Sequence, residues 1–292
     1  MRRRRDRSFE IKTPAQLALM REAGLVVAAA LSATADAVEP GISTAELDAI
    51  AERVIRDAGA IPSFKGYQGF PATICASVND EVVHGIPRPD VRVAAGDLIS
   101  IDCGAIVGGW HGDAAVTAFV GPGSPAQVSP AQAGLLAACE RALWQGLSRA
   151  VAGGRLSDIS AAVEAAARAS GEYGIVEDYV GHGIGSQMHM DPPVPNYGRP
   201  GRGPVLVEGM ALAVEPMLVL GDPETRLLED DWTVVTADGS RAAHFEHTVA
   251  ITADGPWVLT AADGGSSGLA AARAGRVPVS AGAAAAGNAG GS

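Results

Sequence analysis

Residues 99–119 read ISIDCGAIVGGWHGDAAVTAF, and they give the clearest indication of the fold. Gly108 and Gly109 stand between two runs rich in β-forming residues, at 97–107 and 110–120. A glycine pair at such a position is typical of a two-residue hairpin turn, because both turn residues need positive φ angles. The sequence therefore predicts an antiparallel hairpin of two long strands.

The predicted hairpin places two aspartates on the same face. Its register pairs Asp102 with Ala115 and Asp113 with Gly104, so the two aspartates are diagonal neighbours with backbones about 7 to 8 Å apart. Each aspartate interrupts an apolar strand, where an unpaired charge is costly, and a cation between them is the simplest partner. The alternative is that both side chains are exposed on a solvated face of the hairpin.

Four helices are predicted from their start and stop signals. Three begin with Ser or Thr followed three residues later by Gln or Glu, which is the pattern of a capping box. Two of these three also carry Pro at the first helical position. The expected helices cover residues 14–37, 43–59, 129–152 and 158–169.

The order of helices and strands predicts the fold class. Further strands are expected at 73–84, 208–220, 232–236 and 242–252. Two helices are thus followed by strands, and the same order repeats, with a weak sequence echo between 41–58 and 154–169. Helices segregated from antiparallel hairpins predict an α+β domain whose two halves share one sheet.

The composition predicts a folded, soluble protein. Of the 292 residues, 47% are hydrophobic, which is enough for a large core. Every stretch of 18 residues is interrupted by a charge, Gly or Pro, which argues against a membrane span. The net charge of -11 disfavours specific nucleic-acid binding by the body of the protein.

Both ends of the chain depart from this composition. Residues 1–7 hold the basic run Arg2–Arg5 and are expected to form a disordered head, either solvated or in contact with RNA. The apolar stretch that follows resembles a signal peptide in outline, but the helix-start signals at Thr13 favour a helix of the folded protein. Residues 263–292 are rich in Gly and Ala and are expected to form a flexible tail.

Three cysteines bear on the compartment. Cys75, Cys103 and Cys139 have neither the CxxC spacing of a zinc site nor the density of a secreted, disulfide-bonded domain. This sparse set favours a reducing compartment, and we expect a cytoplasmic protein. No base motif accompanies Cys75, so it is expected to pack and not to act as a nucleophile.

Further carboxylates and imidazoles lie in strand or glycine-rich contexts. His182 stands in the glycine frame GHGIG, which lets the backbone approach a ligand closely, and Glu215 stands in a mid-strand sequence. Strand alternation predicts that His244 points to the same side as Glu246, and that His247 points to the opposite side. We therefore expect His244 to support the site and His247 to be structural.

Two Asp, two Glu and one His form an oxygen-rich set of candidate ligands. Such a set suits Mn, Co, Fe or Zn in a two-metal site better than a structural zinc site. A pair of divalent ions activates water and polarises a carbonyl, as hydrolysis requires. The motifs lack phosphate-binding Arg or Lys, so an amide substrate is favoured over a phosphate ester.

Six sequence strings together resemble the type I methionine aminopeptidases. They are SVNDEVVHGIP (77–87), IDCGAIVGGWHGDAA (101–115), GHGIG (181–185), DPPVPNYG (191–198), VEPM (214–217) and FEHT (245–248). The resemblance covers residues 8–262 and implies a pita-bread fold, in which an antiparallel sheet is covered by two helix pairs related by an internal pseudo-twofold. The sequence departs from the family pattern at Met190, where an acidic residue is common, and at His244, where Gln is common.

The resemblance also implies roles for single residues. Five acidic and imidazole residues would hold two divalent metal ions: Asp102, Asp113, His182, Glu215 and Glu246. Asp113 and Glu246 would bridge the ions. Glu215 would also handle the proton of the attacking water, and His84 and His189 would contact the scissile amide.

A methionine pocket is implied in the same way. Aromatic, thiol and thioether side chains would line it: Phe64, Tyr67, Phe70, Cys75, Met188, Met217 and Trp232. Such groups suit a flexible thioether side chain, although ordinary core packing is the alternative for each one singly.

The implied activity is removal of the N-terminal methionine from nascent polypeptides. The enzyme would be a cytoplasmic monomer with a transient ribosome contact, and without a membrane or a specific nucleic-acid partner. Two alternatives remain: a proline-specific peptidase with the same fold, and a catalytically inactive pita-bread protein that binds other molecules.

Overall fold

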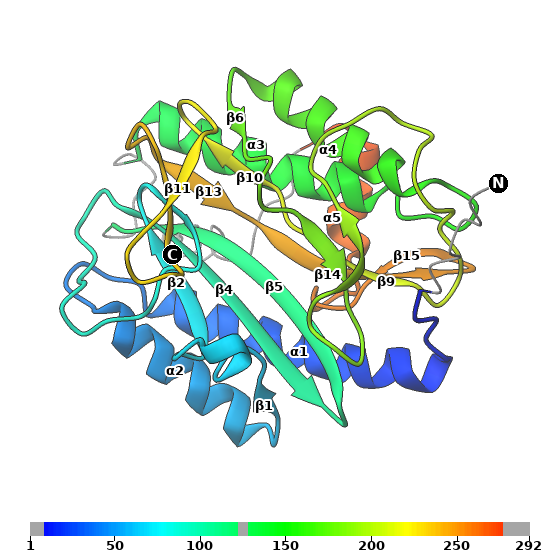
Figure 1. The fold of residues 1–292 in the computed structure, drawn as a ribbon, viewed down its shortest axis with the longest axis horizontal. Coiled ribbons are helices and arrows are strands. Elements are labelled where there is room, and N and C mark those ends of the chain that lie inside the picture. The colour runs from blue at the N-terminus through cyan, green and yellow to red at the C-terminus, as the bar shows by residue number, and fades with distance from the viewer. Residues whose placement is uncertain (1–8, 122–127, 277–292) are drawn as a thin grey trace, which may run out of the picture.

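The computed structural model describes residues 9–121 and 128–276, and a nine-stranded antiparallel sheet lies at its centre (Figure 1). Its strands are β1 (Ile61–Pro62), β2 (Ile74–Val78), β4 (Leu98–Val107), β5 (Trp110–Phe119), β7 (Gly181–Gly183), β8 (Met190–Val194), β9 (Ala211–Val214), β14 (Glu246–Thr252) and β15 (Gly255–Val258). Across the sheet the order is β1-β4-β5-β14-β9-β7-β8, with β2 paired to β4 and β15 paired to β14. Strands from the two halves of the chain therefore meet where β5 pairs with β14.

Two small sheets adjoin the main sheet. The first contains β6 (Gly174–Ile175), β10 (Met217–Val219) and β13 (Ala242–His244), with β10 in the middle. The second contains β3 (Glu81–Val83), β11 (Thr225–Leu227) and β12 (Val234–Thr236), with β12 in the middle. The predicted strands at 73–84, 208–220 and 242–252 are each divided between the main sheet and a small one.

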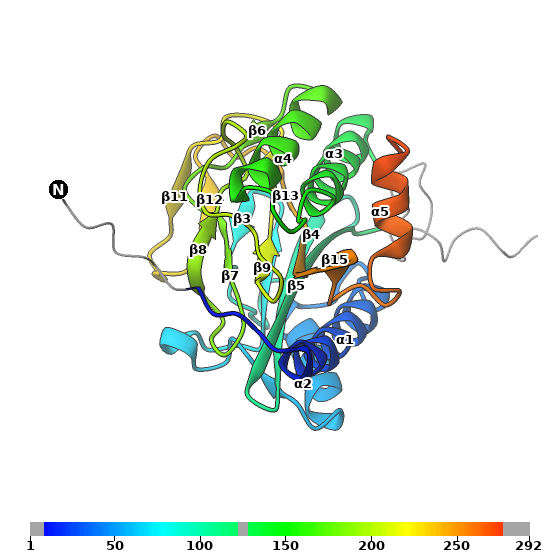
Figure 2. The same cartoon turned by 90° about the vertical axis from the view of Figure 1, so that its right-hand side faces the viewer.

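Four of the helices cover the sheet in two pairs, α1 (Pro14–Asp36) with α2 (Thr44–Asp57) and α3 (Pro130–Leu147) with α4 (Leu156–Ser170). The shorter helix α5 (Ser266–Arg273) packs against α3, and η1 (Tyr67–Gly69) is a 3-10 turn. One core lies between α1, α2 and the strands β2, β4 and β5, and a second lies between α3, α4 and the strands of the other half (Figures 1 and 2). This arrangement confirms the expected α+β fold with two helix pairs on one antiparallel sheet.

The local signals in the sequence act as expected. Thr13, Ser43 and Ser129 each form the capping box that begins a helix. The hairpin β4–β5 has the predicted register, with Asp102 opposite Ala115. Two-residue turn chemistry and side-chain capping therefore fix these elements locally.

Helix α1 is a core helix of the folded protein. By length and composition alone it could cross a membrane, but one side of it is buried against the protein, including Met20 and Val27. At Gly24 the backbone lies so close to Leu259 that an added Cβ atom would be 2.3 Å from the Leu259 carbonyl oxygen. This close approach requires glycine, and it supports the helix interpretation of the N-terminal apolar stretch.

The expectation of a flexible tail from residue 263 is wrong for its first part. Residues Ser266–Arg273 form α5, and Leu269 and Ala272 are buried against α3. Gly268 allows this contact, because an added Cβ would lie 2.4 Å from the Trp144 ring. The other terminal predictions, for residues 1–7 and 277–292, lie outside the described residues.

Replacing Leu269 with alanine should lower the free energy of unfolding by about 2 to 3 kcal/mol, because it opens a cavity under α5. Urea unfolding of the full chain measures the change. Ala270→Gln is the matched control, because Ala270 lies on the exposed side of the same helix and should change stability by less than about 0.5 kcal/mol. Equal stability of Leu269→Ala and the wild type would mean that α5 does not contribute to the core.

Candidate active site

Five acidic and imidazole residues project from strands that are neighbours in the main sheet. Asp102 is on β4, Asp113 on β5, Glu246 at the start of β14, and His182 on β7, while Glu215 follows β9. The strand order places β14 between β5 and β9, and β9 between β14 and β7. The sheet therefore brings together residues that are up to 144 positions apart in the sequence.

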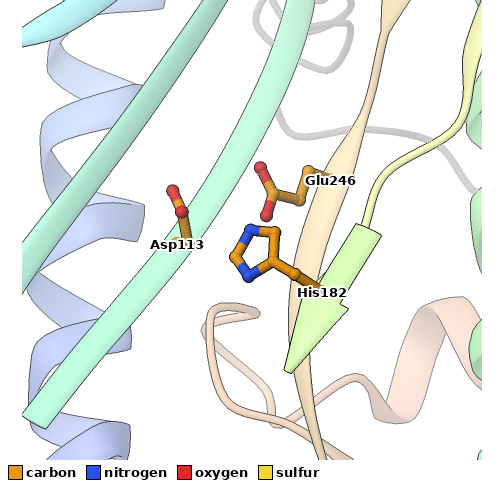
Figure 3. Close-up of side chains that lie close together, drawn as sticks. All are labelled: Asp113, His182 and Glu246. Carbon is orange, nitrogen blue, oxygen red and sulfur yellow. The ribbon is translucent and has the colours of Figure 1, made fainter. Parts of the chain in front are cut away.

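Three of these residues form a compact cluster. One potential ligand atom from each of Asp113, His182 and Glu246 lies within 4.8 Å of the other two. Figure 3 shows their side chains directed toward a common space between β5, β7 and β14. Glu215 adjoins the cluster, since its Oε1 atom lies 3.6 Å from His182 Nε2. Asp102 also adjoins it through a side-chain interaction with Asp113.

The carboxylates of the cluster are buried without a compensating cation among the described residues. Burial raises the pKa of Asp102 to about 7 and that of Glu215 to about 8. Burial, followed by the repulsion between neighbouring acids, raises the pKa of Asp113 and of Glu246 well above their usual values. Such a set is electrostatically unfavourable when ionised, unless positive charge lies between its members.

Unpartnered oxygen atoms show that the cluster fits metal ions. Asp102 Oδ1, Asp113 Oδ1 and Glu246 Oε1 are buried and have no hydrogen-bond partner in the described part of the chain. Buried carboxylate oxygens normally have partners, and those left over here are suited to hold a divalent cation. The donor set therefore fits the metal site predicted from the sequence.

His182 is held in the form that a metal requires. Its Nδ1 atom is 3.0 Å from the Gly183 carbonyl oxygen. A carbonyl oxygen only accepts hydrogen bonds, so Nδ1 carries the proton and Nε2 keeps its lone pair. Burial lowers the pKa of His182 to about 3, which keeps the ring neutral.

A cavity of about 180 Å³ opens beside the cluster. Its lining includes eight of the residues predicted to contact substrate: Phe64, Tyr67, Phe70, Cys75, His84, Met188, His189 and Trp232. Asp102, Asp113, His182, Glu215 and Glu246 also line it, so the cluster and the apolar walls share one space. None of the lining residues is Lys or Arg, which agrees with an uncharged substrate side chain.

Met217 is the exception among the predicted pocket residues. It is buried in a separate apolar cluster with Val83, Val219 and Val234, and is not among the residues that line the cavity. It directly follows Pro216 and begins β10, which belongs to a small sheet. Its side chain therefore packs against that sheet.

Gln68 and Val83 line the cavity although the sequence did not indicate them. Gln68 neighbours Tyr67 in η1, and Val83 immediately precedes His84. Only their positions beside predicted pocket residues could have suggested a role.

The remaining histidines occupy different positions around the site. His84 is largely buried, and burial lowers its pKa to about 4. His244 Nε2 lies 3.6 Å from Glu215 Oε2, so His244 adjoins the cluster as predicted. His247 points away from it, with its Nδ1 atom 2.8 Å from Thr260 Oγ1 and its ring against Trp144, and this confirms its structural assignment. His111 Nδ1 bonds to Ser63 Oγ.

Burial also raises the pKa of the Cys75 thiol well above its usual value. The thiol therefore stays protonated and serves as part of the cavity wall.

The metal-free protein should lose stability as the pH rises from about 4 to 8, because folded Asp102 and Glu215 have pKa values of about 7 and 8 against 3.8 and 4.5 for the free side chains. The protonated side chains stabilise the folded protein fully when the pH is below their pKa values in the unfolded chain. This stabilisation disappears as the pH rises through their pKa values in the folded protein. Divalent metal removes this penalty, so the rise in Tm on adding Mn²⁺ should grow over the same pH range.

Thermal unfolding of the full chain with chelator and with Mn²⁺ measures both trends. Asp102→Asn is the matched variant and should flatten the chelated curve. A metal-induced rise in Tm that is the same at all pH values would contradict the assignment of ionised ligands.

Comparisons with known proteins agree with this site. The model of "Metallopeptidase family M24" matches residues 18–253. Methionine aminopeptidase 1 of Mycobacterium tuberculosis is 55% identical over 254 residues, which are 85% of this chain and 94% of that protein. Methionine aminopeptidase 1 of Bacillus subtilis is 50% identical over 249 residues, with 85% and 98% covered.

Solved structures show the same similarity. Methionine aminopeptidase from Thermotoga maritima superposes with a TM-score of 0.83 at 40% identity, covering 87% of this chain and 99% of that chain. A prolidase from Pyrococcus furiosus superposes with a TM-score of 0.68 at 22% identity, covering 86% of this chain and 65% of that one. The second comparison shows a shared fold only.

Proposed function

Because this chain belongs to metallopeptidase family M24, we propose that it is an aminopeptidase that hydrolyses the peptide bond after an N-terminal methionine. The observation that carries the proposal is one space shared by a buried Asp/His/Glu cluster and apolar, sulfur-containing walls. The cluster suits metal-dependent amide hydrolysis, and the walls suit a thioether side chain.

Two divalent ions are proposed, held by five residues. Asp113 and Glu246 would bridge the two ions. Asp102 would bind one of the ions, and His182 and Glu215 would bind the other. When bound, the ions supply a Lewis acid and an activated water. The mixture of carboxylates with one imidazole suits Mn, Co, Fe or Zn.

Side chains around the ions would complete the chemistry. Glu215, which lies among the ligands, would accept the proton of the attacking water. His84 and His189 line the cavity, where a neutral imidazole would donate a hydrogen bond to the scissile carbonyl. Burial lowers the pKa of both rings, so both are neutral at pH 7.

The methionine side chain would occupy the apolar part of the cavity. Phe64, Phe70, Cys75, Met188 and Trp232 form a separate buried or half-buried apolar cluster there. Phe70 and Trp232 pack edge to face, with ring centroids 5.0 Å apart. A closed wall of this kind favours a flexible apolar side chain over a charged one.

The cellular setting follows from the proposed activity. The substrates would be N-termini of nascent polypeptides, and the enzyme would act in the cytoplasm as a monomer. A transient contact with the ribosome would bring it to those substrates. Binding to ribosomes in a sedimentation assay, with and without residues 1–7, would test that contact.

Peptide hydrolysis after metal exchange tests the proposed function. The full chain is treated with chelator, supplied with Mn²⁺, Co²⁺, Fe²⁺ or Zn²⁺, and assayed on Met-Ala-Ser and on an Xaa-Pro peptide. We expect chelation to abolish methionine release and at least one ion to restore it. Cleavage of the Xaa-Pro peptide alone would indicate a proline-specific peptidase, and binding without hydrolysis of either peptide would indicate an inactive binding protein.

A further inference from the structure

Tyr67 makes a polar contact with His189, and both residues line the cavity. Its hydroxyl oxygen lies 3.0 Å from His189 Nδ1, and the two ring centroids are 5.3 Å apart. The His189 ring also lies near the His182 ring, with centroids 4.3 Å apart. His189 is thus in contact with both a candidate metal ligand and a phenol.

The chain around Tyr67 is shaped to present this hydroxyl. Gly66, Gln68 and Gly69 all have positive φ angles, of 88°, 50° and 93°. Hydrogen bonds of 2.8 Å from Gly66 N to Phe70 O and of 2.9 Å from Phe70 N to Tyr67 O close the turn. A non-glycine residue in the left-handed region is unusual and persists where its surroundings fix the backbone. The turn therefore holds Tyr67 in a defined position.

The nature of the hydrogen bond has a chemical consequence. A carbonyl or carboxylate next to His189 Nδ1 would require that atom to carry the proton, as Gly183 does for His182. A phenol can instead donate its proton to Nδ1, and the ring then carries its own proton on Nε2. Nε2–H is the form that can donate to a carbonyl oxygen in the cavity.

We propose that Tyr67 is a positioning residue, whose hydroxyl orients His189 and holds it in the Nε2–H form. This inference rests on the proposed aminopeptidase function and deepens it. The Tyr67 ring lines the cavity together with other aromatic groups, but its hydroxyl has a separate role, which acts through His189. Removing the hydroxyl alone separates the two roles.

Kinetics of Tyr67→Phe test the proposal, because the variant keeps the ring and loses only the hydroxyl. With Met-Ala-Ser we expect kcat to fall about tenfold, the size typical of a lost orienting partner, while KM and inhibition by free methionine change less than about twofold. In a His189→Ala background, Tyr67→Phe should have no further effect on kcat. Tyr173→Phe, the same change outside the cavity lining, is the control and should match the wild type.

The results that would overturn the proposal are distinct. An unchanged kcat in Tyr67→Phe would refute it. Equal losses of kcat with and without His189 would show that the hydroxyl does not act through that ring. A joint rise in KM and in the methionine inhibition constant would show that Tyr67 only shapes the pocket.

NMR of the protein labelled with ¹⁵N-histidine tests the same inference without turnover. The His189 signals, assigned by comparison with His189→Gln, should show Nε2 protonated and Nδ1 unprotonated in the wild type, and a mixture in Tyr67→Phe. Protonation at Nδ1 in the wild type, or identical spectra for the two proteins, would overturn the proposal. Failure of the wild type to release methionine would instead refute the proposed function and leave this readout intact.

Discussion

Replacing Asp113 or Glu246 with alanine should lower kcat/KM for Met-Ala-Ser by more than about 1,000-fold, because several kcal/mol of transition-state stabilisation depend on the bound metal. Both carboxylates are almost fully buried, and each has an oxygen atom within 4.8 Å of a His182 ring nitrogen. Loss of either proposed bridging ligand would remove a contact to both proposed ions. Metal content per chain, measured by plasma mass spectrometry after desalting, should fall together with activity.

The Tm of these variants in chelator should not fall with activity and metal content, and should stay equal or rise. The wild-type cluster holds mutually repelling carboxylates whose pKa values burial raises. Removing one of them relieves this repulsion, so metal-free Asp113→Ala should have a Tm equal to or above that of the metal-free wild type. Such an outcome separates loss of a ligand from failure to fold.

Asp36→Ala is the matched control, since Asp36 is an exposed acid at the end of α1. It should retain wild-type turnover and metal content. Asp113→Ala or Glu246→Ala with near-normal turnover and a full metal complement would refute the proposed site.

Local chemistry made part of this architecture predictable. The Gly108-Gly109 turn fixes the register of its hairpin, because strand side chains alternate with a period of two, and the register in turn places Asp102 and Asp113 on one face. Side-chain caps fix the starts of α1, α2 and α3 in the same way. Residues that are close together in the sequence determine these features.

The assembly of the cluster depends on the order of strands. His182 and Glu246 come together because β9 pairs with both β7 and β14, and β14 also pairs with β5. Local patterns do not determine which distant strands pair. Residue types and strand contexts indicated the candidate ligands, and resemblance to a family supplied their assignment to two ions.

Two errors in the sequence prediction have tertiary causes. The Gly- and Ala-rich segment after residue 263 was expected to be flexible, but its alanines favour helix and Gly268 lets that helix pack closely on Trp144. The family resemblance implied that Met217 lines the substrate pocket, but Met217 is not among the residues that line the cavity, because the chain moves from the main sheet to a small sheet between Val214 and Met217. Composition and family resemblance do not reveal such contacts.

His189→Ala should lower kcat for Met-Ala-Ser by about 100-fold, within the range for loss of a donor to a developing oxyanion. We propose that His189 acts on the substrate and does not bind metal, since it lines the cavity and its Nδ1 atom contacts the Tyr67 hydroxyl. It is outside the compact cluster of Asp113, His182 and Glu246. Metal content and Tm should therefore stay at wild-type values while turnover falls.

The contrast between His189→Ala and the Asp113 variant distinguishes the two proposed roles. Loss of a ligand lowers metal content and activity together, whereas loss of a substrate contact lowers activity alone. His189→Gln is the matched variant, because its amide can still donate a hydrogen bond from a similar distance, and it should recover part of the lost kcat. If metal content falls in His189→Ala, then His189 supports the metal cluster, and its assignment as a substrate contact is wrong.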